Sequence, residues 1–323
     1  MARMKRLEKL DGFANVQMVE VEQPEPGPDQ MLIEVKRSLI SRGSELFWRY
    51  VREEAVSPEM MGYSDAGEVV GVGANIQDFA VGQRVMANTP HAQYVIAGET
   101  DRSRRAFLLP EELSYETATF LPLATSSVMW MRTSPIESGQ TVVVLGQGIV
   151  GALCAQIVWE RDPGCVIVVD AQPLRCDIAR KLGHENVIDV SQTDSVAAVK
   201  ELTDGKGADL VVECVGGYAG IQSFEQAQKM LAPRGTIHLI AKYQGAPLPL
   251  EGDAFMNKQI IAGIRIDTPR EACMRDAAQM LIDGRVKVAE LITHRLPWEQ
   301  TPDAYHLLYH KPDEALGVIL EWD

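Results

Sequence analysis

One stretch of this sequence restricts the fold more than any other: the apolar run TVVVL at residues 141–145, followed at once by GQGIVG at residues 146–151. The three glycines have GxGxxG spacing, and an apolar helical pattern follows them. In such a strand–turn–helix unit the first glycine permits a tight turn, the second lets a pyrophosphate approach the backbone, and the third allows close packing of the helix on the strand. The helix also presents free N–H groups and its positive dipole end to phosphates. We therefore predict a dinucleotide-binding turn whose contacts come from Gly146, Gly148, Ile149, Val150 and Gly151.

The residues after this turn repeat the same alternation of strand and helix. Short β-branched runs, of the kind buried on both faces of a parallel sheet, occur at residues 165–170, 186–190, 208–216 and 236–241. Helical segments that end at Gly or Pro lie between them. This βαβ succession predicts a doubly wound parallel sheet over residues 124–264.

The two flanking parts of the chain have a different pattern. Residues 1–123 are mostly short alternating runs separated by Gly- and Pro-rich turns, which is typical of antiparallel β structure. Residues 265–323 contain a helical segment and end in a β-branched run, GVILEW. A chain of 323 residues is long enough for two cores. We expect an α/β protein in which a β-rich domain, residues 1–123 and 265–323, is interrupted by the parallel-sheet domain.

Charge and cysteine content exclude several classes of partner. The chain has 31 basic and 45 acidic residues, a formal net charge of −14, which opposes attraction to nucleic acid or anionic membranes. No segment has the apolar length of a membrane span or a secretory signal, so we expect a cytoplasmic protein. The five cysteines are odd in number and lack CxxC spacing, and we expect them to be reduced.

Asp170 bears on the choice of dinucleotide. It ends the strand that follows the glycine turn, where an acidic side chain accepts hydrogen bonds from the adenosine ribose. Its charge would repel a 2′-phosphate, so the sequence favours NAD over NADP. Arg175 lies close enough in sequence to weaken this preference and leaves NADP possible.

With these residues placed, the chain resembles the medium-chain dehydrogenase/reductase superfamily, the relatives of alcohol, polyol and threonine dehydrogenases. The resemblance implies a GroES-like β-rich catalytic domain around a Rossmann domain, a small-molecule substrate and a homodimer. It also implies that Cys214, Val215 and Ala241 contact the cofactor. The matching segments, in chain order, are PEPGPDQMLIEV, SRGSEL, MGYSDAGEVVGVG, VGQRV, HAQYVIA, LGQGIVG, ADLVVECVG, LAPRGTIHLIA and LITHRLPWEQTPDAYHLL.

The sequence departs from the zinc-containing members at two positions. Arg42 stands where those members have a cysteine ligand, and Tyr63 where they have a histidine ligand. The lobe of four cysteines that holds a structural zinc is also missing, and residues 1–90 contain neither Cys nor His. Because tetrahedral zinc sites are built from thiolate, imidazole or carboxylate ligands, we expect no zinc.

Without a metal, hydrogen-bond donors must stabilise the reacting oxygen. The matching positions offer Ser44, Tyr63 and His91 as catalytic residues; alternatively, Ser44 caps a helix that begins at Glu45, Tyr63 is a packed aromatic, and His91 is an ordinary strand histidine. Trp48 lines a substrate pocket or only packs. Arg42 forms a structural ion pair with Glu45, or both contact the substrate.

Three functions remain open at this stage. The favoured one is zinc-independent, NAD(H)-dependent interconversion of a secondary alcohol and a ketone. The second is reduction of an activated C=C bond, as in zinc-free enoyl and quinone reductases, and the third is dinucleotide binding without turnover. Locally, SRGSELFW and MGYSDAGEVV resemble bacteriochlorophyllide a dehydrogenases, but sugar-alcohol and natural-product dehydrogenases share parts of these segments.

Overall fold

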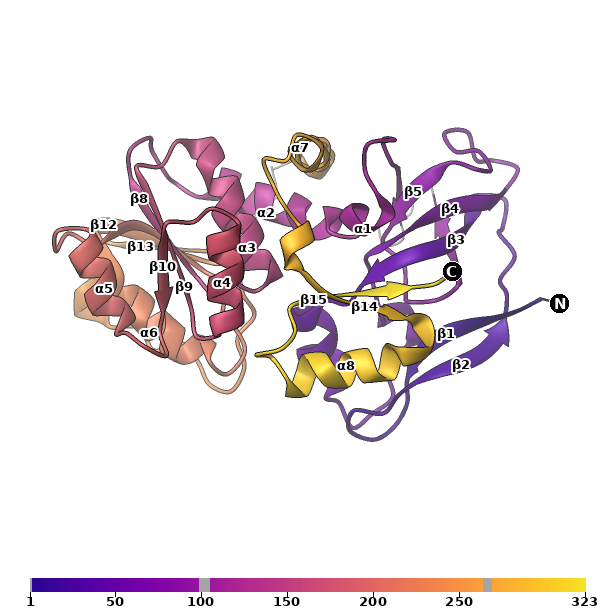
Figure 1. Cartoon of the computed structure of the whole chain (residues 1–323), viewed down its shortest axis with the longest axis horizontal. Helices are drawn as coiled ribbons and strands as arrows, with labels where there is room; N and C mark the ends of the chain where they lie inside the picture. The colour runs from indigo at the N-terminus through magenta and orange to yellow at the C-terminus, as the bar shows by residue number, and fades with distance from the viewer. Residues whose placement is uncertain (1, 99–104, 264–268) are drawn as a thin grey trace. The chain divides into compact units, whose positions relative to one another are not determined.

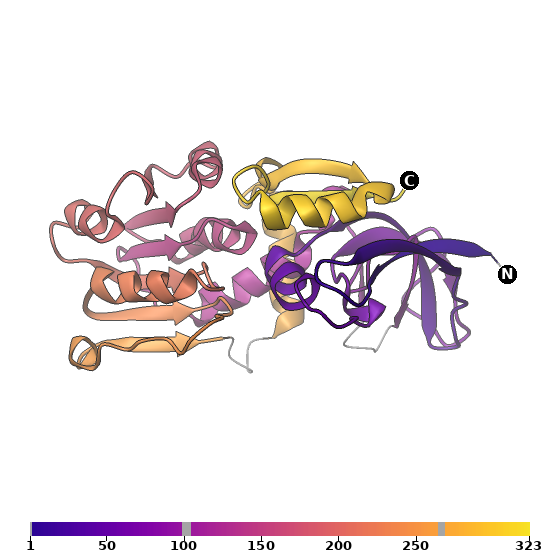
Figure 2. The same ribbon diagram turned by 90° about the horizontal axis from the view of Figure 1, so that it is seen from below.

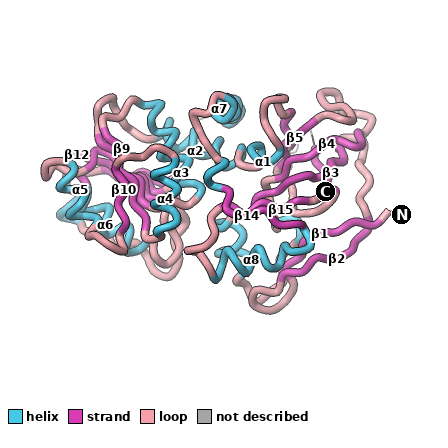
Figure 3. Tube along the Cα trace, in the orientation of Figure 1, coloured by secondary structure: helices cyan, strands magenta, loops and turns pink. Residues whose placement is uncertain are grey.

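The computed structural model describes residues 2–98, 105–263 and 269–323. The chain forms two compact units, one made of Met1–Pro122 with Ile292–Asp323 and the other of Leu123–Leu291. Figure 3 shows strands dominating the first unit, while strands and helices alternate in the second. In the part of the chain that is described, no helix is long and apolar enough to cross a membrane.

The first unit is built on a mainly antiparallel sheet of seven strands. Its order is β14-β15-β3-β4-β5-β7, with β6 also paired to β3, and β1 and β2 form a separate hairpin. The strands β14 and β15 come from the end of the chain, and β15 pairs antiparallel with β3. The strands are β1 (Arg3–Lys9), β2 (Val16–Glu22), β3 (Gln30–Leu39), β4 (Asp65–Val72), β5 (Arg84–Ala87), β6 (Tyr94–Gly98), β7 (Ala106–Leu108), β14 (Ile292–Pro297) and β15 (Gly317–Glu321).

Short helices pack against this sheet, and one of them, η1, holds Arg42, Ser44, Glu45 and Trp48. Helix α8 lies along β14 and β15, and it also packs against η1 (Figure 2). Leu46 and Tyr50 of η1 share a core with Tyr305 and Leu308 of α8. The helices of this unit are η1 (Arg42–Tyr50), η2 (Pro58–Met60), α1 (Tyr115–Ala118), η6 (Trp298–Gln300) and α8 (Thr301–His310).

The second unit contains a parallel sheet of six strands in the order β10-β9-β8-β11-β12-β13. Figure 1 shows helices α4, α5 and α6 beside this sheet. In chain order this is 3-2-1-4-5-6, the arrangement of the Rossmann fold. Consecutive residues of β8, Val142 and Val143, are both fully buried, as expected for a sheet covered on both faces. The strands are β8 (Thr141–Leu145), β9 (Cys165–Asp170), β10 (Asn186–Asp189), β11 (Ala208–Glu213), β12 (Leu231–Leu239) and β13 (Gln259–Ala262).

The connections between these strands are mostly helical. They pack the apolar faces that the sequence pattern indicated, and the predicted α/β fold class is confirmed. The helices are α2 (Leu121–Thr133), α3 (Ile149–Ile157), η3 (Val158–Arg161), α4 (Pro173–Lys181), α5 (Ser195–Leu202), α6 (Gly220–Met230), η4 (Gly252–Phe255), α7 (Arg270–Ile282) and η5 (Ala289–Leu291).

The second boundary between the units differs from the position expected at residues 264–265. The structure assigns α7 to the second unit, which continues to Leu291. Arg132 explains this assignment, because its guanidinium donates to the sulfur of Cys273 (3.3 Å) and pairs with Asp276. A helical segment carries no sequence signal for the unit against which it packs.

Candidate active site

The glycine turn has the geometry that its spacing predicted. Gly146 has a φ of +85°, which favours glycine, and a Cβ there would lie 3.0 Å from the backbone N of Val215. A Cβ on Gly151 would lie 1.7 Å from the carbonyl oxygen of Gly146, so no larger residue fits. A Cβ on Gly148, in contrast, would meet no heavy atom within 4 Å. The turn is therefore tightly closed on its inner side and open where a ligand would approach the backbone.

Helix α3 begins directly from this turn. Gly148 is its N-cap, and no side chain caps it, so the N–H groups of Ile149 and Val150 point out of the first turn. Asp170 lies beside them and accepts hydrogen bonds from the backbone N of Gln147 (2.6 Å) and of Gln172 (2.8 Å). These donors and the open backbone suit a pyrophosphate and a ribose.

Arg175 contacts Asp170 rather than extending into solvent. Its Nη1 lies 3.5 Å from Oδ2 of Asp170, and its side chain is 14% exposed. Its Nε is buried without a hydrogen-bond partner. The guanidinium is thus held by the carboxylate that would contact a ribose.

Three further residues expected at the cofactor lie in loops at the carboxyl end of the parallel sheet. The backbone N of Cys214 donates to Leu145 O (2.8 Å), and Val215 is 40% exposed. Ala241 lies in the loop after β12. A hydrogen bond with Cys154, together with burial, raises the pKa of the Cys214 thiol well above its usual value. Cys214 is therefore an unreactive thiol at neutral pH.

In the first unit, Tyr63 and Ser44 come together around a residue that the sequence did not indicate. The hydroxyl of Tyr63 donates to Oγ of Ser41 at 2.6 Å, and it also hydrogen-bonds to Ser44. Burial raises the pKa of Tyr63 to about 12. At neutral pH this phenol is therefore protonated and can act as a donor. Ser41 is the first residue of the matching segment SRGSEL, but it was not among the residues predicted to be functional.

His91 lies at a buried position instead of beside an open surface. Its side chain is 0% exposed. Nε2 is 3.0 Å from Oε2 of Glu45, and Nδ1 is 2.9 Å from Oγ of Ser38. Both ring nitrogens are therefore engaged by side chains of the protein.

Glu45 is the centre of this buried hydrogen-bond network. Oε1 accepts from the backbone N of Ser41 (2.8 Å), and Oε2 accepts from His91 and from the hydroxyl of Tyr305. On the far side of His91, Nε1 of Trp322 donates to Ser38 (2.9 Å). The network links η1 to α8 and to the end of the chain.

Asp65 borders the same network. Its Oδ2 accepts from the hydroxyl of Thr89 (2.7 Å), and its Oδ1 lies 3.7 Å from Nδ1 of His91. Burial raises the pKa of Asp65 to about 8. For Glu45, burial opposes ionisation, but the charge of His91 and the surrounding donors outweigh it and lower its pKa. For His91, burial opposes protonation, but Glu45 outweighs it and raises its pKa.

Several expectations for η1 need correction. The helix begins at Arg42 with Ser41 as its N-cap, so Ser44 lies within it and does not cap a helix that begins at Glu45. Glu45 is fully buried and pairs with His91, whereas the guanidinium of Arg42 lies 5.8 Å from the ring centroid of Phe47. A buried Glu45 does not suit the expected contact with a substrate. Trp48 is 44% exposed and remains available to one.

Two side chains stand at the positions that the resemblance matched to metal ligands. Arg42 carries a cation, and Tyr63 is a hydrogen-bonded phenol with its pKa raised to about 12. Among residues 2–98, 105–263 and 269–323, no group of three or more His, Cys, Asp or Glu side chains is arranged to hold a metal ion.

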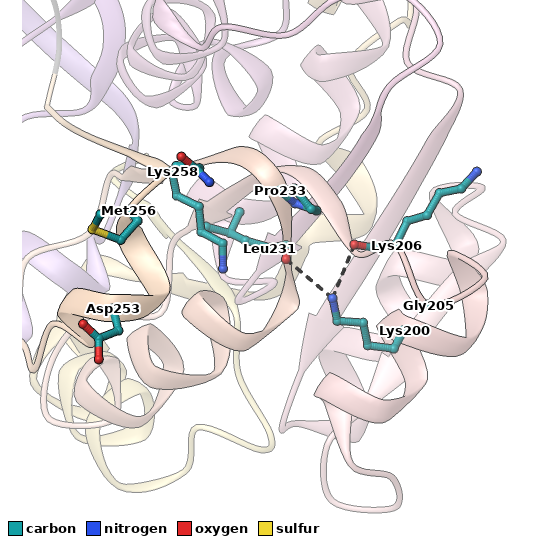
Figure 4. A pocket seen from close by; sticks show the side chains of 9 residues that line it. Lys200, Gly205, Lys206, Leu231, Pro233, Asp253, Met256 and Lys258 are labelled. Carbon is teal, nitrogen blue, oxygen red and sulfur yellow. Dashed lines mark hydrogen bonds between the residues drawn. The ribbon is translucent and has the colours of Figure 1, made fainter.

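A pocket of about 380 Å³ lies in the second unit, between the end of α5, the start of β12 and the segment from η4 to β13. Figure 4 shows the ammonium group of Lys200 directed at the carbonyl oxygens of Lys206 and Leu231. None of the residues predicted to be functional lines this pocket.

The fold and the glycine turn together define a dinucleotide-binding protein of the dehydrogenase type. A family model described as zinc-binding dehydrogenase matches residues 150–282. The chain is 26% identical to a sorbitol dehydrogenase of Bacillus subtilis (strain 168), covering 92% of this chain and 91% of that protein. It is 25% identical to an L-threonine 3-dehydrogenase of the same organism, covering 95% of each.

Solved structures share the whole fold. A 2R,3R-butanediol dehydrogenase from Bacillus subtilis superposes with a TM-score of 0.83 at 21% identity, covering 98% of this chain and 99% of that one. An alcohol dehydrogenase from Escherichia coli CFT073, complexed with NADH, superposes with a TM-score of 0.85 at 18% identity. The match covers 99% of this chain and 100% of that one. A dehydrogenase from Sinorhizobium meliloti 1021, bound to NADP, superposes with a TM-score of 0.83 at 22% identity. The match covers 99% of this chain and 100% of that one. Medium-chain alcohol and polyol dehydrogenases match this chain over nearly its full length, and the prediction of an NAD(P)-dependent dehydrogenase of this kind is confirmed.

Proposed function

We propose that this protein is a zinc-independent alcohol dehydrogenase that uses NAD(H) to interconvert a secondary alcohol and a ketone. The dinucleotide, when bound, supplies or accepts the hydride. The open turn at Gly148 and the first turn of α3 would bind its pyrophosphate, and Asp170 its adenosine ribose. Arg175, held by Asp170, would not be free to pair with a 2′-phosphate.

The observation that carries the zinc-independent part of the proposal is the hydrogen bond from Tyr63 to Ser41 (2.6 Å) at a position that matches a metal ligand. In ketone reduction Tyr63 would donate its proton to the developing alkoxide, and Ser41 and Ser44 would relay a replacement proton. In the reverse direction the same hydroxyls would carry the proton away. A positioned acid of this kind typically contributes about 100- to 10,000-fold in rate.

His91 and Glu45 support these hydroxyls in our proposal. Glu45 fixes the backbone N–H of Ser41, and His91 fixes Glu45. We therefore assign His91 a positioning role in place of direct catalysis. The family model that names zinc matches residues 150–282 and does not include Arg42 or Tyr63.

Turnover after metal removal tests this function. We expect the protein, dialysed against a strong chelator, to reduce NAD with at least one secondary alcohol from a panel of polyols, L-threonine, 2,3-butanediol and a hydroxyethyl tetrapyrrole. Its rate should equal that of the untreated protein. Loss of activity on chelation, restored by stoichiometric zinc, would show that the metal-free mechanism is wrong. Reduction of enones but of no ketone would instead favour the C=C reductase.

A further inference from the structure

One buried carboxyl group joins the two loops that carry Cys214, Val215 and Ala241. It belongs to Glu213, the last residue of β11, which is 0% exposed. Its carbonyl oxygen accepts from the backbone N of Ile240 (3.1 Å) and of Ala241 (3.2 Å). The backbone of Glu213 thus already ties β11 to the loop after β12.

The side chain of Glu213 makes a second set of links. Oε1 accepts from the backbone N of Val215 (3.0 Å), and Oε2 accepts from the hydroxyl of Tyr243. The backbone of Gly216 and the hydroxyl of Ser223 donate to the same carboxyl group. Donors from the 214–217 loop, the 240–244 loop and helix α6 therefore converge on one group.

The ring of Tyr243 packs against Gly220, the first residue of α6. A Cβ on Gly220 would lie 2.6 Å from Cδ1 of the tyrosine ring, so the ring occupies the volume that any other residue would fill. The backbone on either side of the tyrosine is paired as well. Gly217 N donates to Lys242 O (2.7 Å), and Gln244 N donates to Gly217 O (3.2 Å).

The loop held in this way touches the dinucleotide turn itself. A Cβ on Gly146 would lie 3.0 Å from both the N and the Cγ2 of Val215, and a Cβ on Gly151 would lie 3.4 Å from the Cβ of Cys214. A shift of the 214–217 loop would therefore change the wall of the turn. The carboxyl group of Glu213 connects this loop to the hydroxyl of Tyr243.

We propose that Glu213 and Tyr243 form a clamp that positions the 214–217 and 240–244 loops for NAD(H), with neither side chain touching the reacting atoms. The inference rests on the proposed function, since it concerns the same dinucleotide. A buried carboxyl group is costly when its oxygens lack hydrogen-bond partners. Removing the tyrosine hydroxyl leaves Oε2 without this donor and loosens the two loops relative to each other.

The test uses the full chain, with Tyr243→Phe as the variant and Tyr218→Phe as the matched control. Tyr218 lies in the neighbouring loop and is 73% exposed. We expect Tyr243→Phe to weaken NADH binding about tenfold, measured by fluorescence titration, because a buried carboxyl oxygen loses its hydrogen-bond donor. Hydrogen exchange of residues 214–217 and 240–244 should speed up, and that of β8 should not. Tyr218→Phe should change neither quantity.

The outcomes separate the clamp from the proposed function. Wild-type protein that binds neither NADH nor NADPH would contradict the proposed function. If the wild-type protein binds NADH and Tyr243→Phe changes that affinity by less than twofold, the clamp alone would be contradicted. Equal weakening by both tyrosine variants would also contradict it, because the effect would then be general to the region. Faster exchange throughout the second unit would show that the hydroxyl merely stabilises the fold, which likewise overturns the proposal.

Discussion

In the proposed metal-free mechanism, the hydroxyl of Tyr63 transfers the proton and Ser41 and Ser44 relay it. Tyr63→Phe removes one oxygen and keeps the ring that packs around it. Because Tyr63 would supply the proton, we expect kcat to fall by roughly 100-fold or more while NADH affinity stays near wild type. Stopped-flow turnover and NADH titration measure the two quantities.

Tyr94→Phe is the matched control for this change. Tyr94 is partly buried, and its hydroxyl donates to Glu34 at 3.3 Å, in the same unit. Tyr94→Phe should keep the wild-type kcat. Ser41→Ala should lower kcat, as Tyr63→Phe does. A Tyr63→Phe enzyme as fast as wild type on an authentic substrate would show that this hydroxyl does not transfer the proton.

Asp170 is a single residue that should set the cofactor preference. Asp170→Asn keeps an oxygen to accept from Gln147 N and removes the charge that repels a 2′-phosphate. It also releases Arg175 from its ion pair. We expect the ratio of NADPH to NADH affinity to rise about tenfold or more, since like charges a few ångströms apart repel by at least 1 kcal/mol. Titration of both dinucleotides measures it, and an unchanged ratio would show that Asp170 does not discriminate.

At the scale of elements, the sequence predicted the buried strands and the glycine turn correctly. The β-branched runs of β8, β9 and β11 form buried strands, and the glycine spacing predicted the turn before α3. These features depend on periodicity and on backbone conformation, which the sequence states directly. The winding of η1 does not follow from such local rules. Its final turn includes an i→i−5 hydrogen bond, from Val51 N to Leu46 O (3.3 Å). Nothing in SRGSELFWRY signals this wide winding.

The buried network shows why the candidate site was only partly predicted. Resemblance led to Ser44, Tyr63 and His91 because each stands at a position with a counterpart in the superfamily. Tyr305 reaches Glu45 because α8 packs on η1, and Trp322 reaches Ser38 because β15, which precedes it, pairs with β3. Such contacts are set by topology, so a single sequence contains no local pattern that reveals them.

At the scale of the whole molecule, the buried network should make stability depend on pH. Burial raises the pKa of Asp65 from its ordinary value of 3.8 to about 8. Between these limits the folded chain retains a proton that the unfolded chain has lost, so the free energy of unfolding falls as pH rises. His91 acts in the same direction, since its raised pKa stabilises the fold below 6.5 and that stability is lost as pH passes its folded value. Glu45, with its lowered pKa, contributes oppositely, and its contribution is lost only in acid.

We therefore expect Asp65→Asn to flatten the decline in stability between about pH 5 and pH 8. The amide resembles the protonated carboxyl group and still offers an oxygen to Thr89. Since the two units need not unfold in one step, hydrogen exchange of peptides from β3 and β4 at a series of pH values is the suitable measurement. The exposed Asp313→Asn is the control, and it should follow the wild-type curve. If Asp65→Asn showed the same decline as wild type, Asp65 would not hold a proton in the folded chain, and the pH dependence would have to come from the His91–Glu45 pair.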